Sequence, residues 1–168
     1  VRHPKEELDQ FNHFSEQFNY RQEAVKKTLA EKGIPLESID AVVGRGGLIK
    51  SVPSGTYLVN DRMIEDLKAG LQGDHVCNLG GQIARKIAND IGPDVPAFIV
   101  DPPIVDELEP IAKISGMPLI TRRPLYQPLN QRAVARRVAR DLGVKYEEMS
   151  FIVTHLGGGI STGVHYKG

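Results

Sequence analysis

The stretch FIVTHLGGGISTGVHY at residues 151–166 decides how the rest of this chain is interpreted. Its first four residues, 151–154, are apolar or β-branched and predict a buried strand. After the consecutive glycines Gly157, Gly158 and Gly159, side-chain character alternates with a period of two, which predicts a second strand and not a helix. We therefore expect a hairpin whose glycine turn brings backbone N–H groups close to a ligand.

A strand–glycine–strand hairpin can hold a phosphate in a nest of backbone N–H donors. The pattern differs from a Walker A loop and from a Rossmann turn, because both of those lead into a helix. The alternative is a plain hairpin with a flexible tip. His155 precedes the turn and favours phosphate binding.

Composition excludes several classes of partner. Lys and Arg number 21, and so do Asp and Glu, so no global field attracts nucleic acid or an acidic membrane. Cys77 is the single cysteine, which excludes an internal disulfide and fits a cytoplasmic location. The sequence holds no zinc-type Cys/His cluster, no signal peptide and no apolar run of about 18 residues. Since it starts at Val1 and stops at Gly168, directly after an expected strand, we expect a piece of a longer protein.

Helical patterns dominate the first half of the chain. Residues 4–32 are expected to be mostly helical, with an apolar stripe from Leu8 to Phe18, a break near residues 19–20 and a second helical face over residues 24–29. Another helix should start near residue 60, behind a capping Asn or Asp. Residues 79–91 carry apolar side chains at every fourth position and predict the clearest helix of the chain.

Short apolar runs between these helices predict buried strands at residues 40–44 and 97–100, and residues 56–59 predict a further strand. Helices that alternate with short strands indicate an α/β fold. A later helix is expected over residues 130–142, with an inward apolar face of Val134, Val138 and Leu142 and an outward face of Arg132, Arg136 and Arg140. These arginines could bind nucleic acid, but the zero net charge favours a face in solvent.

Candidate functional side chains lie where the expected strands and turns end, which is where α/β proteins build their sites. Arg45, flanked by glycines, could clamp a carboxylate or phosphate, or could be a turn arginine in solvent. Asp101 could orient a Mg²⁺-bound phosphate or cap the next turn. His75 and Asn78 could direct donors at a transferring group, although the sequence alone favours a surface histidine at His75.

Five strings of the sequence resemble the butyrate kinase family in order and over nearly the whole chain. They are AVVGRGGLIKSVPSGTYLVN (41–60), HVCNLGGQIA (75–84), AFIVDPPIVDELEPIAKISGMP (97–118), LNQRAVARRVA (129–139) and THLGGGISTGVHYKG (154–168). That family belongs with the acetate kinases in the sugar kinase–Hsc70–actin superfamily. The resemblance implies ATP-dependent phosphorylation of a short-chain carboxylate to an acyl phosphate, with Mg²⁺, in the cytoplasm, by an oligomer of identical subunits.

The resemblance also implies domains and roles. Residues 1–103 would form an incomplete ribonuclease H-like lobe of the actin/hexokinase superfamily, without its first phosphate hairpin. Residues 104–168 would supply a connector, a helix and the first hairpin of a second such lobe. Without the first hairpin and the adenosine-binding part, this chain alone is expected to be inactive. The family has Phe-His where this chain has Tyr126-Gln127, so a histidine near the substrate cleft is missing.

By its position, Arg45 resembles the family's residue that binds the substrate carboxylate or phosphoryl group. Asp101 resembles the aspartate that organises Mg²⁺, directly or through water. His155 and the following glycines resemble the second phosphate loop, which binds ATP. His75 lies near the place of the active-site histidine of acetate kinases, with Asn78 beside the substrate. The rivals are an acetate or branched-chain fatty-acid kinase, or a non-catalytic binding or assembly module of this fold.

Overall fold

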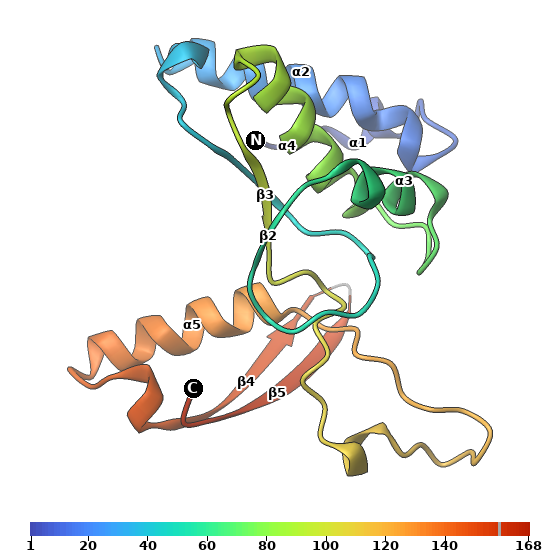
Figure 1. The fold of residues 1–168 in the computed structure, drawn as a ribbon, viewed down its shortest axis with the longest axis vertical. Helices are drawn as coiled ribbons and strands as arrows, with labels where there is room; N and C mark the ends of the chain where they lie inside the picture. The colour runs from blue at the N-terminus through green and yellow to red at the C-terminus, as the bar shows by residue number, and fades with distance from the viewer. Residues whose placement is uncertain (158) are drawn as a thin grey trace. The chain divides into compact units, whose positions relative to one another are not determined.

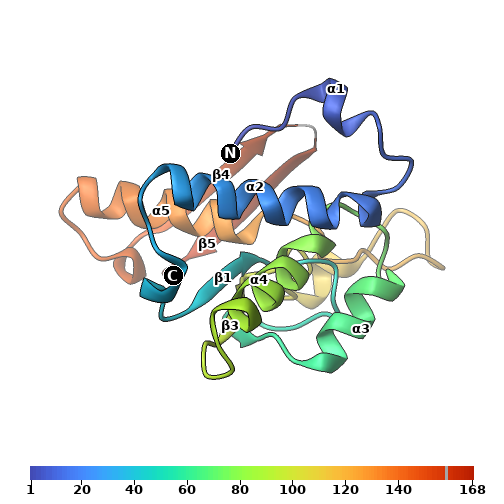
Figure 2. The same ribbon diagram turned by 90° about the horizontal axis from the view of Figure 1, so that it is seen from above.

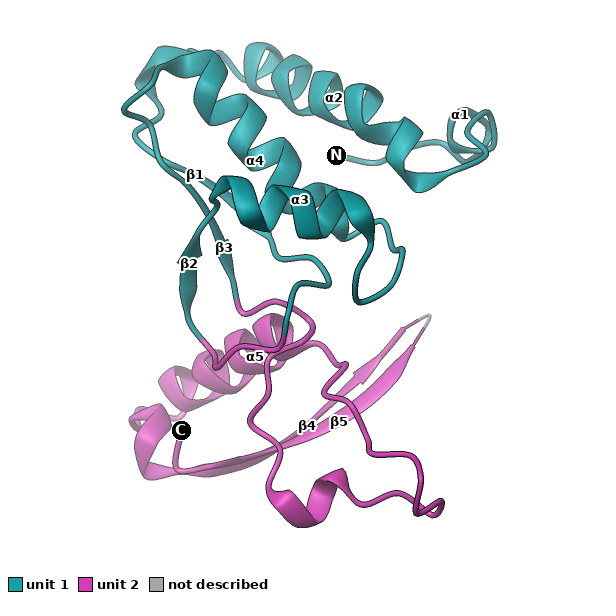
Figure 3. Cartoon of the chain, turned by 45° about the vertical axis from the view of Figure 1, so that its right-hand side comes forward, with its two compact units in different colours: residues 1–50, 55–100 teal, residues 51–54, 101–168 magenta. Residues whose placement is uncertain are grey.

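The computed structural model describes residues 1–157 and 159–168, and these form two compact units (Figure 3). Unit 1 contains residues 1–50 and 55–100, and unit 2 contains residues 51–54 and 101–168. Each unit has its own small sheet, and Figure 1 follows the chain through both. This mixture of helices and sheets confirms the α/β class. None of the described helices is long and apolar enough to cross a membrane.

The N-terminal region is less helical than predicted. It holds α1 (Lys5–Leu8), the 3-10 turn η1 (Phe14–Gln17) and α2 (Phe18–Glu31), so the interruption precedes residues 19–20. The chain restarts at η1 because Glu16 accepts hydrogen bonds from the backbone of residues 12 and 13, at 2.9 and 3.3 Å, and so caps the new helix. The expected apolar stripe from Leu8 to Phe18 was wrong, since Phe14 lies outside α2 and is 41% exposed.

The sheet of unit 1 has the order β1-β3-β2, with β1 (Val42–Arg45) parallel and β2 (Thr56–Leu58) antiparallel to the central β3 (Ala97–Val100). Strand β3 is the buried strand that the sequence predicted, with Ile99 fully buried. The prediction of a buried β1 was wrong, because Val43 is 60% exposed. An edge strand covered by a helix on one face buries only alternate residues.

Helices α3 (Asp61–Ala69) and α4 (Asn78–Ile91) confirm the two predicted starts, and the extra 3-10 turn η2 spans Leu36–Ser38. The side chain of Asn60 caps α3 by accepting from the backbone N–H of Met63 at 2.8 Å. Helix α4 packs on β1 and β3, and α2 and α3 in turn pack against α4 (Figure 2).

Unit 2 is built on the hairpin of β4 (Ser150–Leu156) and β5 (Ile160–Tyr166), with α5 (Pro128–Asp141) across one face. Two 3-10 turns complete it, η3 (Pro110–Lys113) and η4 (Tyr146–Glu148). The hairpin confirms the two predicted strands. The prediction of a buried run at residues 151–154 was wrong, because α5 covers one face only. Within this unit the other face carries apolar side chains that are about three-quarters exposed: Ile152 76%, Leu156 74%, Ile160 76%, Val164 76% and Tyr166 74%.

Helix α5 presents a different face to the hairpin from the one predicted. Its buried positions are Pro128, Gln131, Ala135 and Ala139, whereas Val134 and Val138 are 42% and 40% exposed, and Leu142, just beyond the helix, is 60% exposed. Small side chains let the helix approach the strands closely, where Ala135 and Ala139 join Tyr146 and Val153 in one cluster. The valine pattern alone did not indicate this, since small residues mark an interface only when the partner surface is known.

Candidate functional site

Arg45 ends β1 at a point where strand and helix touch backbone to backbone. A Cβ atom on Gly44 would lie 2.3 Å from the carbonyl oxygen of Gly80, and one on Gly80 would lie 2.0 Å from the carbonyl oxygen of Arg45. Only glycine permits so close an approach. The first turn of α4, whose backbone N–H groups carry partial positive charge, is therefore held beside Arg45. This end of unit 1 is suited to an anion.

Asn78 fastens the loop after β1 to the start of α4. Its Oδ1 atom accepts from the backbone N–H of Leu48 at 2.8 Å, and its Nδ2 atom donates to the carbonyl of Gly73 at 2.9 Å. The side chain is buried, at 4% exposure. In this structure Asn78 positions the loop that follows Arg45. Its contact with a substrate stays a prediction.

His75 lies in the exposed turn before α4. The backbone N–H of Cys77 donates to its Nδ1 atom at 3.1 Å, so the neutral imidazole carries its proton on Nε2. The ring also packs on Phe14, with 6.3 Å between centroids. Burial raises the pKa of the Cys77 thiol, and the nearby positive charge of Arg45 opposes this shift. Arg45, His75 and Cys77 thus share one corner of unit 1.

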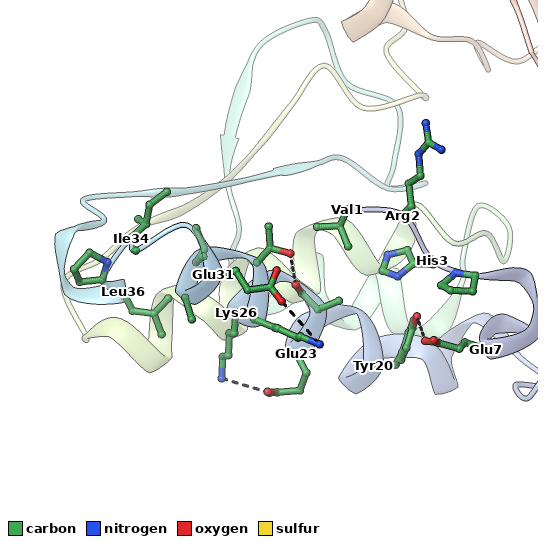
Figure 4. Close-up of a pocket in the computed structure, with 18 of the residues that line it drawn as sticks. Val1, Arg2, His3, Glu7, Tyr20, Glu23, Lys26, Glu31, Ile34 and Leu36 are labelled. Carbon is green, nitrogen blue, oxygen red and sulfur yellow. Dashed lines mark hydrogen bonds and ion pairs between the residues drawn. The ribbon is translucent and has the colours of Figure 1, made fainter.

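A cavity of about 720 Å³ in unit 1 includes His75 and Asn78 in its wall, beside the apolar side chains of Phe14, Phe18 and Leu67. A larger one, of about 1090 Å³, runs along α2 and the N-terminal residues (Figure 4) and contains none of the predicted site residues. In that view Tyr20 and Glu7 point toward one another, and their hydrogen bond braces the N-terminus. Of these two cavities, the smaller one therefore holds the predicted site residues His75 and Asn78.

In unit 2, Asp101 follows β3 with an unusual backbone. Its φ is +39°, and the residue is 7% exposed. Positive φ is uncommon outside glycine, although Asp and Asn tolerate it best, and such residues collect at functional sites. The strained backbone is an observation independent of the sequence pattern that singled out this carboxylate.

His155 lies within β4, one residue before its end, on the face that α5 covers. Its Nδ1 atom is 3.1 Å from the amide nitrogen of Asn130, in the first turn of α5. Its Nε2 atom faces the turn, because a Cβ atom on Gly157 would lie 3.1 Å from it. The imidazole of His155 thus lies between the first turn of α5 and the glycine turn.

The glycine turn differs in detail from the expected nest. The N–H of Gly157 donates to the carbonyl oxygen of Gly159 at 3.1 Å, so this donor already closes the turn. Gly157 does not have a left-handed backbone. Gly158, which was also predicted to bind the phosphate of ATP, lies outside the described residues.

A charged cluster in unit 2 was missed from the sequence. Arg132, predicted to lie in solvent, has a side chain only 17% exposed and pairs with Glu107. Burial raises the pKa of the Glu107 carboxyl, but hydrogen bonds from Ser54 and Arg132 outweigh it and leave the pKa below its ordinary value. Burial, with help from the charge of Glu107, raises the pKa of Tyr126 to about 12. No pattern in the helix marks Arg132, because its partner comes from a distant loop.

The predicted residues fall into two sets. Arg45, His75 and Asn78 belong to unit 1, whereas Asp101, His155 and the glycines belong to unit 2. Among the described residues no group of three or more His, Cys, Asp or Glu side chains is arranged to hold a metal ion. Mg²⁺ is usually bound through one or two carboxylates, with phosphates and water supplying the rest. A Mg²⁺ site that Asp101 shares with a phosphate stays a prediction.

Comparison with known proteins identifies the relatives. No family model matches the chain. Over all 168 residues it is 51% identical to butyrate kinase 1 and 48% identical to butyrate kinase 2 of Clostridium acetobutylicum. The chain covers 47% of each of these proteins, so it spans about half the length of the curated relatives that it matches. The resemblance that the sequence motifs indicated is thus confirmed along the whole chain, which is related over its full length to the butyrate kinases.

Proposed function

We propose that the whole protein transfers a phosphoryl group from ATP to a short-chain carboxylate, butyrate, and forms an acyl phosphate reversibly. The observation that carries this proposal is the identity of 51% and 48% over all 168 residues with two butyrate kinases. The positions of Arg45, Asp101 and His155 at the ends of strands support it further.

The chemistry needs positioning more than covalent catalysis. A carboxylate is already an anion and requires no strong base, so the protein must hold two anions together and stabilise the charge on the transferring group. Arg45 would pair with the substrate, and the Nε2–H groups of His75 and His155 would donate to the phosphoryl oxygens. Asp101 would hold Mg²⁺, directly or through water, and the bound ion would neutralise charge on the phosphates.

We extend the proposal to the fold and the assembly. Residues 1–103 and 104–168 would belong to two ribonuclease H-like lobes of the actin/hexokinase superfamily, in a cytoplasmic oligomer of identical subunits that binds neither nucleic acid nor membrane. The division of the chain into units near residue 100 accords with two lobes. The two-stranded hairpin under α5 accords with the start of a second one.

The test is a hydroxamate assay of acyl phosphate on the whole protein, with acetate, butyrate and isobutyrate compared at equal concentration. We expect butyrate to give the highest kcat/KM. Each methylene in an apolar pocket contributes only about 1–3 kcal/mol, so the other acids should react more slowly and not be excluded. A preference for acetate or isobutyrate would replace butyrate with that substrate. No acyl phosphate from any of them would favour a non-catalytic module.

A further inference from the structure

The first turn of α5 contacts the hairpin through two consecutive residues, Asn130 and Gln131. His155 and Ser161 are direct partners across β4 and β5, at the pair next to the last before the glycine turn. Asn130 contacts His155 at 3.1 Å, and the Nε2 atom of Gln131 donates to the hydroxyl of Ser161 at 3.2 Å. The first turn of α5 therefore contacts both strands of the hairpin, at the base of the glycine turn.

Gln131 is the buried part of this contact between α5 and the hairpin. It is fully buried, and a Cβ atom on Gly163 would lie only 2.1 Å from its Oε1 atom. Its close approach to Gly163 and its hydrogen bond to Ser161 place the first turn of α5 directly against β5. Asn130, its neighbour in that turn, is held in place relative to His155 although it is itself exposed.

The contact between Asn130 and His155 determines where the imidazole carries its proton. An amide nitrogen can only donate a hydrogen bond, so Nδ1 of His155 must accept, and the neutral ring then bears its proton on Nε2. That atom faces Gly157. His75 reaches the same tautomer by another route, since its Nδ1 atom accepts from the backbone of Cys77.

We propose that Asn130 is a positioning residue that keeps His155 in its Nε2–H tautomer and directs this donor at the glycine turn. The inference rests on the proposed function, in which an anionic phosphoryl group lies at that turn. An Nε2–H donor stabilises such a group, whereas the other tautomer would present a lone pair to it. Residues that orient a metal-bound histidine in this way typically contribute about 10–100-fold to activity, and we expect an effect of the same order here.

The tautomer can be measured without any activity. In the whole protein labelled with 15N-histidine, long-range 15N–1H correlation spectra at about pH 8.5, where ordinary imidazoles are neutral, distinguish protonated from unprotonated ring nitrogens. His155→Gln identifies the signals of His155. We expect a protonated Nε2 and an unprotonated Nδ1 in the wild type. Asn130→Asp replaces the donor with an acceptor, so it should move the proton of the neutral ring to Nδ1.

Kinetics of the whole protein complete the test. Asn130→Leu keeps the shape of the side chain without its donor, and should lower kcat about 10–100-fold with little change in the KM for ATP. Arg137→Leu is the matched control, because Arg137 is an exposed α5 residue 75% accessible in its side chain, and its kcat should stay unchanged. Circular dichroism would verify that each variant is folded.

Each result bears on one claim. A wild-type spectrum with the proton on Nδ1, or a proton that does not move in Asn130→Asp, would overturn the tautomer assignment. The expected spectra together with a normal kcat in Asn130→Leu would overturn the positioning role. An inactive whole protein that gives the expected spectra would instead refute the proposed function and leave the tautomer assignment standing.

Discussion

At Asp101 the backbone and the side chain can be tested separately. Asn tolerates φ of +39° as well as Asp does, whereas Ala does not, so Asp101→Asn removes the charge and keeps the backbone preference. We expect both Asp101→Asn and Asp101→Ala to lose acyl phosphate formation by at least a hundredfold in the whole protein. The alanine variant should be less stable to urea than the asparagine variant by about 1–2 kcal/mol. An active Asp101→Asn enzyme would mean that this carboxylate is structural.

Arg45 presents a second prediction at the scale of the residue. If the guanidinium pairs with an anion through two N–H groups, lysine cannot replace it, because an ammonium group lacks the planar fork. We expect Arg45→Lys to reduce kcat/KM for butyrate at least about tenfold. Arg62→Lys, at a side chain 67% exposed on α3, is the control and should change nothing. Equal kinetics for the two variants would contradict the pairing.

At the scale of the element, the fit between α5 and β5 depends on Gly163. Its Cβ atom in Gly163→Ala would overlap Gln131, which is fully buried, so the helix must move away from the strand. Overpacking of this kind typically costs about 1–3 kcal/mol. Gly159→Ala, whose Cβ atom meets nothing within 4 Å, should be close to neutral in urea unfolding. The added variant Gln131→Ala should recover part of the loss, since the two residues are coupled.

The ion pair of Arg132 and Glu107 links α5 to the loop that precedes it. The pKa of Glu107 is lowered in the folded state, so the carboxylate contributes stability that is present above the ordinary Glu value of about 4.3 and is lost as the pH falls through the folded pKa. Arg132→Gln should therefore show a smaller loss of stability between about pH 5 and pH 3 than the wild type. Arg140→Gln, at a side chain 76% exposed, is the control, and identical acid profiles for wild type and Arg132→Gln would refute the linkage.

At the scale of the whole molecule, the chain spans 47% of its butyrate kinase relatives, and the active unit is proposed to be the whole protein. We expect the purified 168-residue chain to form no acyl phosphate in the hydroxamate assay, while the whole protein does. Kinases usually turn over at about 1–100 s⁻¹. A rate in that range from the chain alone would show that nothing beyond these residues is required.

The sequence by itself determined the elements with strong local signals. The period-two pattern around the glycines predicted both strands of the hairpin, the four-residue spacing of Leu79 and its successors predicted α4, and Asn60 predicted the start of α3. The motifs also indicated the butyrate kinase relatives, because a long ordered set of strings is far more specific than any single glycine motif. These signals are local or collinear, so they can be read without knowledge of packing.

Tertiary structure alone decided which faces are buried and what each polar group contacts. The valines of α5 are exposed because Gln131 and two alanines fit closer to the strands, and a sequence contains no record of that distance. The pairing of Arg132 with Glu107 and of Asn130 with His155 joins residues 25 positions apart in each case. Hydrogen bonds and close packing depend on positions in space, and only the folded chain brings such distant residues within their reach.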